Sequence, residues 1–139
     1  MKSRLIYWLT YAGMWLLALL PFRALYVLSD GFCFLMHYIV NYRRKVVRNN
    51  LHNAFPEKSE AELREIECKF YRYICDYMLE EVKMLRMSFK ELCRRMEYDN
   101  KEEYLAMIEK HGGIVLVIPH YANFEWITGM SSIMREGDI

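Results

Sequence analysis

The stretch GGIVLVIPHYANFEW, residues 112–126, decides the fold that the sequence predicts. Its centre is a run of apolar, mostly β-branched residues from Ile114 to Ile118, which ends at Pro119 and is followed at once by His120. A run of this kind, without polar alternation, is typical of a strand buried on both faces of a parallel sheet. The residues after Asn123 favour a helix, so the stretch predicts the strand and helix that open an α/β unit.

A parallel strand needs neighbouring strands, and the chain offers few. The segment RRMEY, residues 94–98, is a candidate strand, although FKELCRRMEYD can also be helical. We therefore expect the chain to be the front part of a larger protein, α/β in its complete form. As it stands, the predicted fold is mostly α-helical, with a membrane anchor and only the first strand or strands of the sheet. Taken alone it is not expected to catalyse, because an unpaired strand leaves backbone groups without hydrogen-bond partners.

His120 falls outside the carboxyl end of the predicted strand, where open α/β sheets place their sites. Glu125 follows five residues later, and on a regular helix the two side chains would point about 140° apart. If the chain instead bends through residues 121–123 into a helix, Glu125 on the first turn can reach an imidazole nitrogen, fix the tautomer and support the positive charge. The pattern then predicts a general base. The alternative is a histidine that caps the helix and a glutamate that interacts with its N-terminus.

Composition and charge point to a membrane partner. The 139 residues are 54% hydrophobic and 15% aromatic, which excludes a disordered chain. Residues 1–58 carry eight Lys and Arg against two Asp and Glu, whereas the remaining residues carry eleven against sixteen. The basic half is also the apolar half, which favours a membrane over a nucleic acid.

The cysteines indicate neither a disulfide framework nor a metal site. The sequence has no C-x-x-C pair, and no histidines stand at zinc-finger spacing from the cysteines. We expect reduced core residues of a cytoplasmic domain at all four positions, Cys33, Cys68, Cys75 and Cys93.

Two apolar segments fill residues 1–42, which we predict to be the membrane anchor. The first, Leu5–Phe22, has no charged residue and would extend about 27 Å as a helix, close to the thickness of a bilayer core. It lacks a clear small-x-small cleavage site, so we interpret it as a membrane span and not as a signal peptide. The second, Ala24–Val40, contains Asp30 and is a poorer span that could be interfacial or re-entrant. One span and a hairpin both remain open.

A basic cluster follows the anchor in YRRKVVRNN, residues 42–50. By the positive-inside rule this cluster, which contains Arg43, Arg44, Lys45 and Arg48, lies on the cytoplasmic side. Anionic lipid headgroups would account for it at about 1 kcal/mol per charge, and we favour that interpretation. Phosphate groups of a substrate or an acidic protein partner are the alternative, so Arg43, Arg44 and Arg48 are also candidate substrate-binding residues.

Residues 43–139, the predicted N-terminal part of the catalytic domain, show three capping-box patterns: Ser59 with Glu62, Ser88 with Glu91, and Asn100 with Glu103. After the first cap, apolar residues recur at steps of mostly three or four, which predicts a long amphipathic helix with one buried stripe. That stripe comprises Leu63, Ile66, Phe70, Ile74, Tyr77, Val82 and Leu85. The helix after Asn100 is expected to end at the glycine pair, with His111 as its C-terminal cation.

The chain resembles a known family, the lipid A biosynthesis lauroyl/myristoyl acyltransferases of Gram-negative bacteria, within the wider lysophospholipid acyltransferase group. The resemblance covers the hydrophobic N-terminus, the block YRRKVVRNNLHNAFPEKSEAELREIECKFYRYICDYMLE, and the stretch GGIVLVIPHYANFEW. In the last of these His120, Asn123 and Glu125 match the family pattern. The family usually has Gly in place of Ala122 and Trp in place of Phe124.

The resemblance implies acyl transfer from an acyl carrier protein thioester to a hydroxyl of a phosphorylated glucosamine disaccharide. The reaction would take place at the cytoplasmic face of the bacterial inner membrane, without a metal or another cofactor. His120 would remove the hydroxyl proton, Glu125 would orient the imidazole, and Asn123 would bind substrate. The expected partners are the carrier protein, the glycolipid acceptor and membrane lipids, and no nucleic acid. A non-catalytic, membrane-anchored helical module derived from the front of such an enzyme is the alternative.

Overall fold

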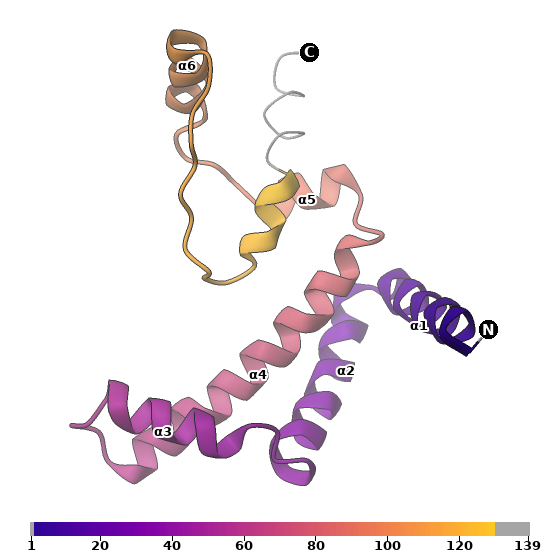
Figure 1. Cartoon of the computed structure of the whole chain (residues 1–139), viewed down its shortest axis with the longest axis vertical. Helices are drawn as coiled ribbons and strands as arrows, with labels where there is room; N and C mark the ends of the chain where they lie inside the picture. Colours follow the sequence, from indigo (N-terminus) through magenta and orange to yellow (C-terminus); the bar gives the residue numbers. More distant parts are fainter. Residues whose placement is uncertain (1, 130–139) are drawn as a thin grey trace. The chain divides into compact units, whose positions relative to one another are not determined.

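The computed structural model describes residues 2–129, and the chain forms two compact units, residues 1–83 and 84–139. The first unit contains α1 (Lys2–Leu19), α2 (Phe22–Phe34), the π-helical turn η1 (Leu35–Ile39), α3 (Arg44–Ala54) and nearly all of α4 (Glu60–Met84). The second contains α5 (Phe89–Arg95), α6 (Lys101–His111) and the 3₁₀ helix η2 (Phe124–Gly129) (Figure 1). The prediction of a mostly helical chain is confirmed. No β-strand is present among residues 2–129, so the predicted first strands are not confirmed.

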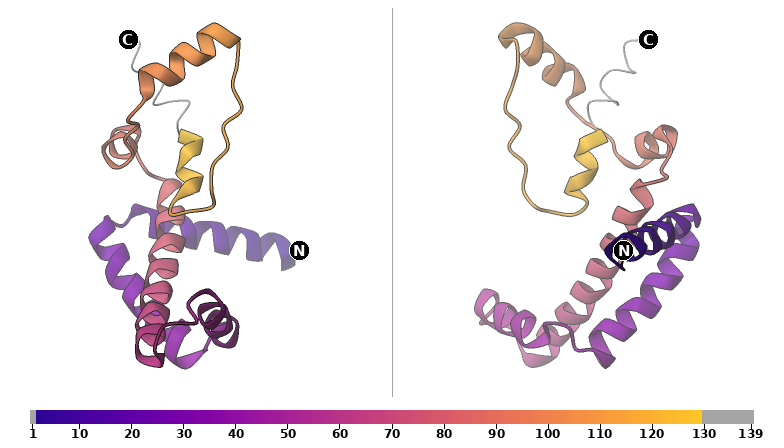
Figure 2. Two further views of the ribbon diagram at one scale, coloured as in Figure 1. Left: turned by 90° about the vertical axis from the view of Figure 1, so that its left-hand side faces the viewer. Right: turned by 45° about the vertical axis from the view of Figure 1, so that its right-hand side comes forward.

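The long helix α4 is the element on which the rest of the first unit assembles. The helices α2 and α3 precede α4 in the chain, lie beside it and run in the opposite direction (Figure 2). Three side-chain pairs mark the order from the N-terminal to the C-terminal end of α4: His52 with Glu60 at 3.3 Å, Asp30 with Arg72 at 3.9 Å, and Tyr26 with Glu80 at 2.6 Å. The helix α3 therefore lies along the first half of α4, and α2 lies along the second half.

The buried side of α4 differs from the predicted stripe. The buried residues are Leu63, Glu67, Tyr71 and Cys75, which stand at steps of four. Of the predicted stripe only Leu63 is fully buried, while Phe70 is 40% exposed. The prediction was wrong because it counted apolar residues only, whereas the core of this unit is built around a carboxylate, that of Glu67.

The junction between α1 and α2 is held by one lysine of α4. The Lys83 ammonium donates hydrogen bonds to the carbonyl oxygens of Ala18 at 2.8 Å and Leu20 at 2.7 Å. These carbonyls lie at the end of α1, where no intrahelical donor remains, and a cation at this end also complements the helix dipole. The same nitrogen lies 5.7 Å from the centre of the Phe22 ring, so Lys83 fixes the break at which α2 begins.

This break separates the two apolar segments that the sequence analysis assigned to the anchor. Of residues 2–129, no helix taken singly has both the length and the apolar character to cross a bilayer. The segments Phe22–Ile39 and Arg44–Ala54 are long and apolar enough when taken together, but the chain bends by 89° between them. The predicted span Leu5–Phe22 is not confirmed, because α1 ends at Leu19 and its uncharged part measures only about 22 Å. The division into an anchor at 1–42 and a catalytic part at 43–139 stays a prediction.

Two of the three predicted caps form as expected. The Glu62 carboxylate accepts the Ser59 backbone N–H at 2.9 Å, and the Ser88 hydroxyl accepts the Glu91 N–H at 3.2 Å. Asn100 also stands at an N-cap, but its side chain makes no capping hydrogen bond. The helix that it precedes ends at Gly112, as predicted, because this glycine adopts a φ of +73° that other residues rarely take. In the RRMEY segment, helix α5 continues to Arg95 and no strand forms.

Candidate functional site

The segment that was predicted to be a strand crosses from α6 to η2 as an extended connection (Figures 1 and 2). Its side chains are largely exposed, with Val115 at 92% and Val117 at 89%. No strand among the described residues pairs with it. A β-branched run prefers a pleated, packed environment, which the segment does not have among the described residues.

The chain then makes the turn that the sequence analysis predicted. The Tyr121 N–H donates to the carbonyl of Pro119 at 2.9 Å, and the Trp126 N–H donates to the carbonyl of Asn123 at 3.0 Å. Between them Ala122 adopts a φ of +52°, a left-handed conformation that disfavours a residue with a Cβ. This explains physically why a glycine would suit the position.

The turn places His120 just before η2 and Glu125 in its first turn, as predicted. The His120 side chain is exposed, and its imidazole lies against the Phe124 ring with the ring centres 4.4 Å apart. Within residues 2–129 no hydrogen bond joins His120 to Glu125. The predicted pair is therefore close in the chain but not assembled, and the roles of the two residues stay a prediction.

A cavity of about 370 Å³ lies beside this turn in the second unit. Ile118, Asn123 and Trp126 are among the residues that line it, together with Arg95 at the end of α5 and the next residue, Met96. Trp126 is almost completely buried and anchors η2, while Gly129 lies against Leu92 of α5, where a Cβ would clash with the leucine side chain. The second unit thus holds Asn123 and η2 in place, but His120 projects into solvent.

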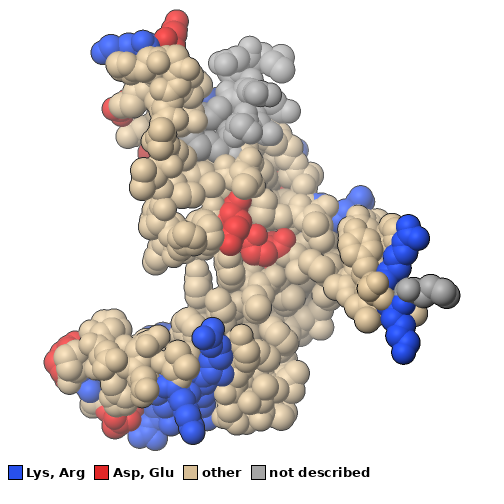
Figure 3. Space-filling view, viewed as in Figure 1, with Lys and Arg blue, Asp and Glu red and all other residues tan. Residues whose placement is uncertain are grey.

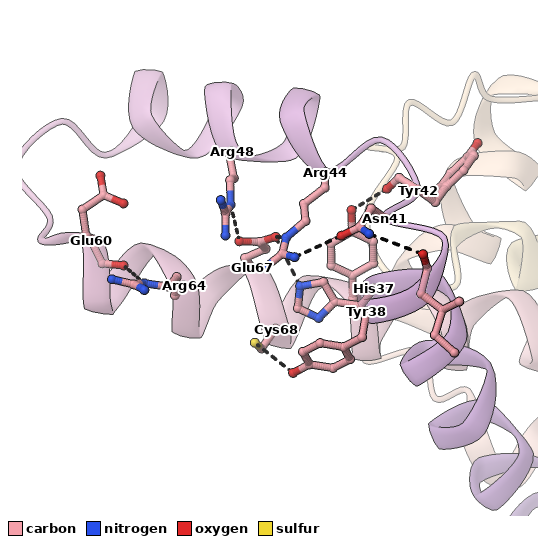
Figure 4. A network of polar contacts seen from close by, with 12 residues as sticks. His37, Tyr38, Asn41, Tyr42, Arg44, Arg48, Glu60, Arg64, Glu67 and Cys68 are labelled. Carbon is pink, nitrogen blue, oxygen red and sulfur yellow. Dashed lines mark hydrogen bonds and ion pairs between the residues drawn. The ribbon is translucent and has the colours of Figure 1, made fainter.

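The other candidate residues, Arg43, Arg44 and Arg48, belong to the first unit, where two of them hold a buried carboxylate (Figure 4). Glu67 has only 2% of its side chain exposed. The Nε atom of Arg44 donates to Glu67 Oε1 at 2.7 Å, and the Nε atom of Arg48 donates to Glu67 Oε2 at 2.9 Å. The Nε2 atom of His37 lies 3.2 Å from Oε1. We call these four residues, Glu67, His37, Arg44 and Arg48, the Glu67 cluster.

The electrostatics of the Glu67 cluster favour the ionised carboxylate. Burial opposes ionisation of Glu67, but the hydrogen bonds from Arg48, Arg44 and His37 outweigh it, so the pKa of this carboxyl lies below its ordinary value. His37 is itself fixed by stacking on Tyr71, with ring centres 4.4 Å apart and an interplanar angle of 12°. The cluster therefore ties η1, α3 and α4 together through one charge.

The π-helical turn η1 brings His37 into this cluster. The Val40 N–H donates to the carbonyl of Leu35 at 2.9 Å, a spacing of five residues that widens the turn. After it Asn41 and Arg43 both adopt positive φ values, of 52° and 53°, and the chain reverses into α3. Lys and Arg side chains gather over α3 as a result (Figure 3).

Sequence reasoning missed the Glu67 cluster. The pair of His37 and Glu67 is not evident from the sequence, because the two residues are 30 positions apart, in η1 and α4. A signal existed in the form of a lone glutamate between Leu63 and Tyr71 on one helix face, opposite a dense basic segment. Arg44 and Arg48 thus have a structural role that suffices to explain them, whereas Arg43 has no part in the cluster.

A family model described as bacterial lipid A biosynthesis acyltransferase matches residues 1–134. The chain belongs to this acyltransferase family. The lipid A biosynthesis lauroyltransferase of Escherichia coli (strain K12) is 30% identical over 122 residues, which are 86% of this chain and 40% of that enzyme. The chain thus spans about two fifths of the length of this relative. No solved structure gives a significant match.

Proposed function

We propose that this acyltransferase-family chain carries the catalytic histidine of an enzyme that transfers a fatty acyl group from an acyl carrier protein thioester to a hydroxyl of a lipid A precursor. The observation that supports it best is the family match over residues 1–134, which includes the turn from His120 to Glu125. The exposure of His120 is compatible with access for a large substrate.

In the proposed reaction, an imidazole nitrogen of His120 takes the proton of the acceptor hydroxyl as its oxygen attacks the thioester carbonyl carbon. The tetrahedral intermediate then expels the thiolate of the carrier, the carbon–sulfur bond breaks, and His120 returns the proton to the sulfur. Glu125 orients the imidazole and stabilises its cation, for which its side chain has to approach His120 more closely than in the isolated turn. Asn123 is the candidate for binding the substrate.

We also propose that the enzyme works at the cytoplasmic face of the bacterial inner membrane. The supporting feature is the surface of α1, on which Leu5, Trp8 and Leu9 are each 59–65% exposed. An exposed apolar and aromatic helix of this kind is typical of attachment to a lipid interface. The membrane lipids and the phosphorylated glycolipid acceptor would then lie on the same side as the carrier protein.

The second candidate is a non-catalytic membrane-attached module. Two observations favour it for the chain by itself: His120 makes no hydrogen bond to Glu125, and residues 113–119 have no partner strand among the described residues. A general base on an unsupported segment lacks the fixed geometry that makes it effective. The two candidates differ in whether this chain alone turns over substrate.

The experiment uses two proteins, the chain itself and a chimera in which the chain replaces the matching segment of the E. coli lauroyltransferase. Each is assayed in detergent with an acyl carrier protein thioester and a lipid A precursor. We expect turnover by the chimera and its loss in His120→Ala, while His111→Ala, the matched control at the exposed end of α6, keeps the rate. An unchanged rate in His120→Ala would refute the proposed mechanism. Multiple turnovers by the chain alone would refute the second candidate.

A further inference from the structure

A long groove runs between α2–η1, α3 and α4 in the first unit and encloses about 690 Å³. Its lining is mostly apolar and includes Phe32, Met36, Val47, Phe70, Ile74 and Met78. The size lies in the range of small-molecule pockets, which are typically apolar with a few polar groups. Phe70 and Ile74 belong to the stripe that the sequence assigned to the core, so the groove explains why apolar residues stand on a face of α4 that is not buried.

A second cavity, of about 500 Å³, adjoins the groove at the start of α3. It is lined by Arg43, Arg44, Lys45 and Arg48 with Asn41 and Val46. Arg43 and Val46 line both cavities, so the cationic cavity lies directly beside the apolar groove. The two form one amphipathic site.

The cationic cavity keeps a net positive charge although two of its arginines are paired with Glu67. Glu67 compensates Arg44 and Arg48 through their Nε atoms. Among residues 2–129, Arg43 and Lys45 form no ion pair with a carboxylate. The guanidinium of Arg43 and the ammonium of Lys45 are therefore available to an anion, and guanidinium and ammonium groups both bind phosphate.

We propose that the groove and the cationic cavity together bind one phospholipid molecule, with an acyl chain in the groove and the phosphate at Arg43 and Lys45. The charge of the cavity and the apolar lining of the groove favour an amphiphile over a free anion or a neutral alkane. All residues of this site lie in the first unit, so the inference does not rest on the proposed catalytic role of His120. It assigns to the first unit a specific lipid site in addition to general attachment to a membrane.

The test uses the full chain in a non-ionic detergent and a photoreactive lysophosphatidic acid with a diazirine at the end of its acyl chain. After irradiation, the labelled residues are mapped by mass spectrometry. We expect label on the residues of α4 and α2 that line the groove, such as Phe70 and Ile74. Three unlabelled competitors separate the sources of binding: lysophosphatidic acid, lysophosphatidylcholine with the same chain, and inorganic phosphate.

The variants Arg43→Gln and Ile74→Trp separate the two halves of the site. Arg43→Gln should raise the half-saturating concentration of lysophosphatidic acid about tenfold, as expected for the loss of one charge-assisted contact. Arg23→Gln is the matched control, because Arg23 is an exposed arginine of α2 that lines neither cavity. Ile74→Trp fills the groove and should abolish labelling there. Circular dichroism of each variant confirms that the helices are retained.

Four results would overturn the proposal. The first is label spread over α1 and not concentrated in the groove. The second is an equal effect of Arg43→Gln and Arg23→Gln, and the third is displacement of the probe by inorganic phosphate alone at the same concentration as by the lipid. The fourth is a stable dimer in which the groove is unlabelled, since a second copy of the chain would then cover it. The mapping on the wild-type chain decides the question even if a variant fails to fold.

Discussion

The two regions that carry the polar chemistry of this chain are built in opposite ways. In the Glu67 cluster a buried carboxylate has three cationic or hydrogen-bonding partners within 3.2 Å, all supplied by neighbouring helices. At the His120 turn the imidazole contacts one aromatic ring, and the apolar run before it is exposed. The first region is enclosed by its own partners, whereas the second presents an exposed imidazole after an exposed apolar run. We infer that the first unit is the more stable part of the chain and that the segment before the turn is less well supported.

The largest expected effect concerns catalysis at the turn, measured in the chimera. His120→Ala should lower kcat by about 10²- to 10⁴-fold, the usual contribution of a general base. Glu125→Ala should lower kcat by a smaller factor. The double variant should have nearly the same kcat as His120→Ala, because the effects of residues that act as a unit are not additive. Independent, multiplying effects of the two substitutions would show that Glu125 does not act through His120.

The next effect concerns stability in the Glu67 cluster. Glu67→Ala should lower the free energy of unfolding by about 3–5 kcal/mol, because it leaves Arg44 and Arg48 without their partner at a partly buried site. Glu65→Ala removes an exposed carboxylate of the same helix, which pairs with Lys69 at the surface, and should change stability by about 0.5 kcal/mol at most. Urea titrations followed by circular dichroism compare the two. Similar losses would mean that the cluster does not hold the first unit together.

The pH dependence of stability follows from the same carboxylate. The pKa of Glu67 is lower in the folded chain than in an unfolded one, so its ionisation stabilises the fold at pH values above about 4.3, the ordinary pKa of glutamate. This contribution is lost as the pH falls through the lower, folded pKa. The free energy of unfolding is measured for wild type and Glu67→Gln at pH 7 and at acid pH. It should fall more on acidification in the wild type than in Glu67→Gln. Parallel curves would assign the acid sensitivity to other carboxylates.

A smaller effect is expected at the N-cap of α5. Ser88→Ala removes the acceptor of the Glu91 N–H and should destabilise the second unit by about 1 kcal/mol. Ser88→Gly should destabilise the unit by only a few tenths of a kcal/mol, because glycine is tolerated at the N-cap. Thermal melts of the two variants, compared with wild type, test the cap. An equal loss in both would assign it to something other than the hydroxyl.

The smallest effect is expected at Ala122. Ala122→Gly relieves a left-handed conformation that costs a residue with a Cβ about 1 kcal/mol, and part of the gain is offset by the larger entropy of glycine in the unfolded chain. We expect slower hydrogen exchange at the Trp126 amide, which closes the turn. Ala61→Gly, in the exposed first turn of α4, is the control and should destabilise. Faster exchange in Ala122→Gly would show that the turn is not strained.

The sequence predicted what depends on local chemistry. Capping boxes set the starts of α4 and α5, Gly112 set the end of α6, and the bend through residues 121–123 placed Glu125 on a first helical turn. Contacts between distant residues could not be predicted. The pairing of His37 with Glu67 depends on a π-helical turn and on two helices that meet side by side, and neither leaves a periodic pattern. The break after α1 could not be predicted for a similar reason, since Lys83 stabilises it through contacts that hydropathy does not detect.

The contrast between the two regions is tested by amide hydrogen exchange on the full chain in detergent. We expect the amides of α4 between Glu67 and Cys75 to exchange at least about 10³-fold more slowly than free peptide, because they open only with the first unit. The amides of Val115 and Val117 should exchange within about tenfold of the free-peptide rate, since the extended segment has no partner strand among residues 2–129. Equal protection of both segments would contradict the conclusion that the His120 turn lacks the support that the Glu67 cluster provides.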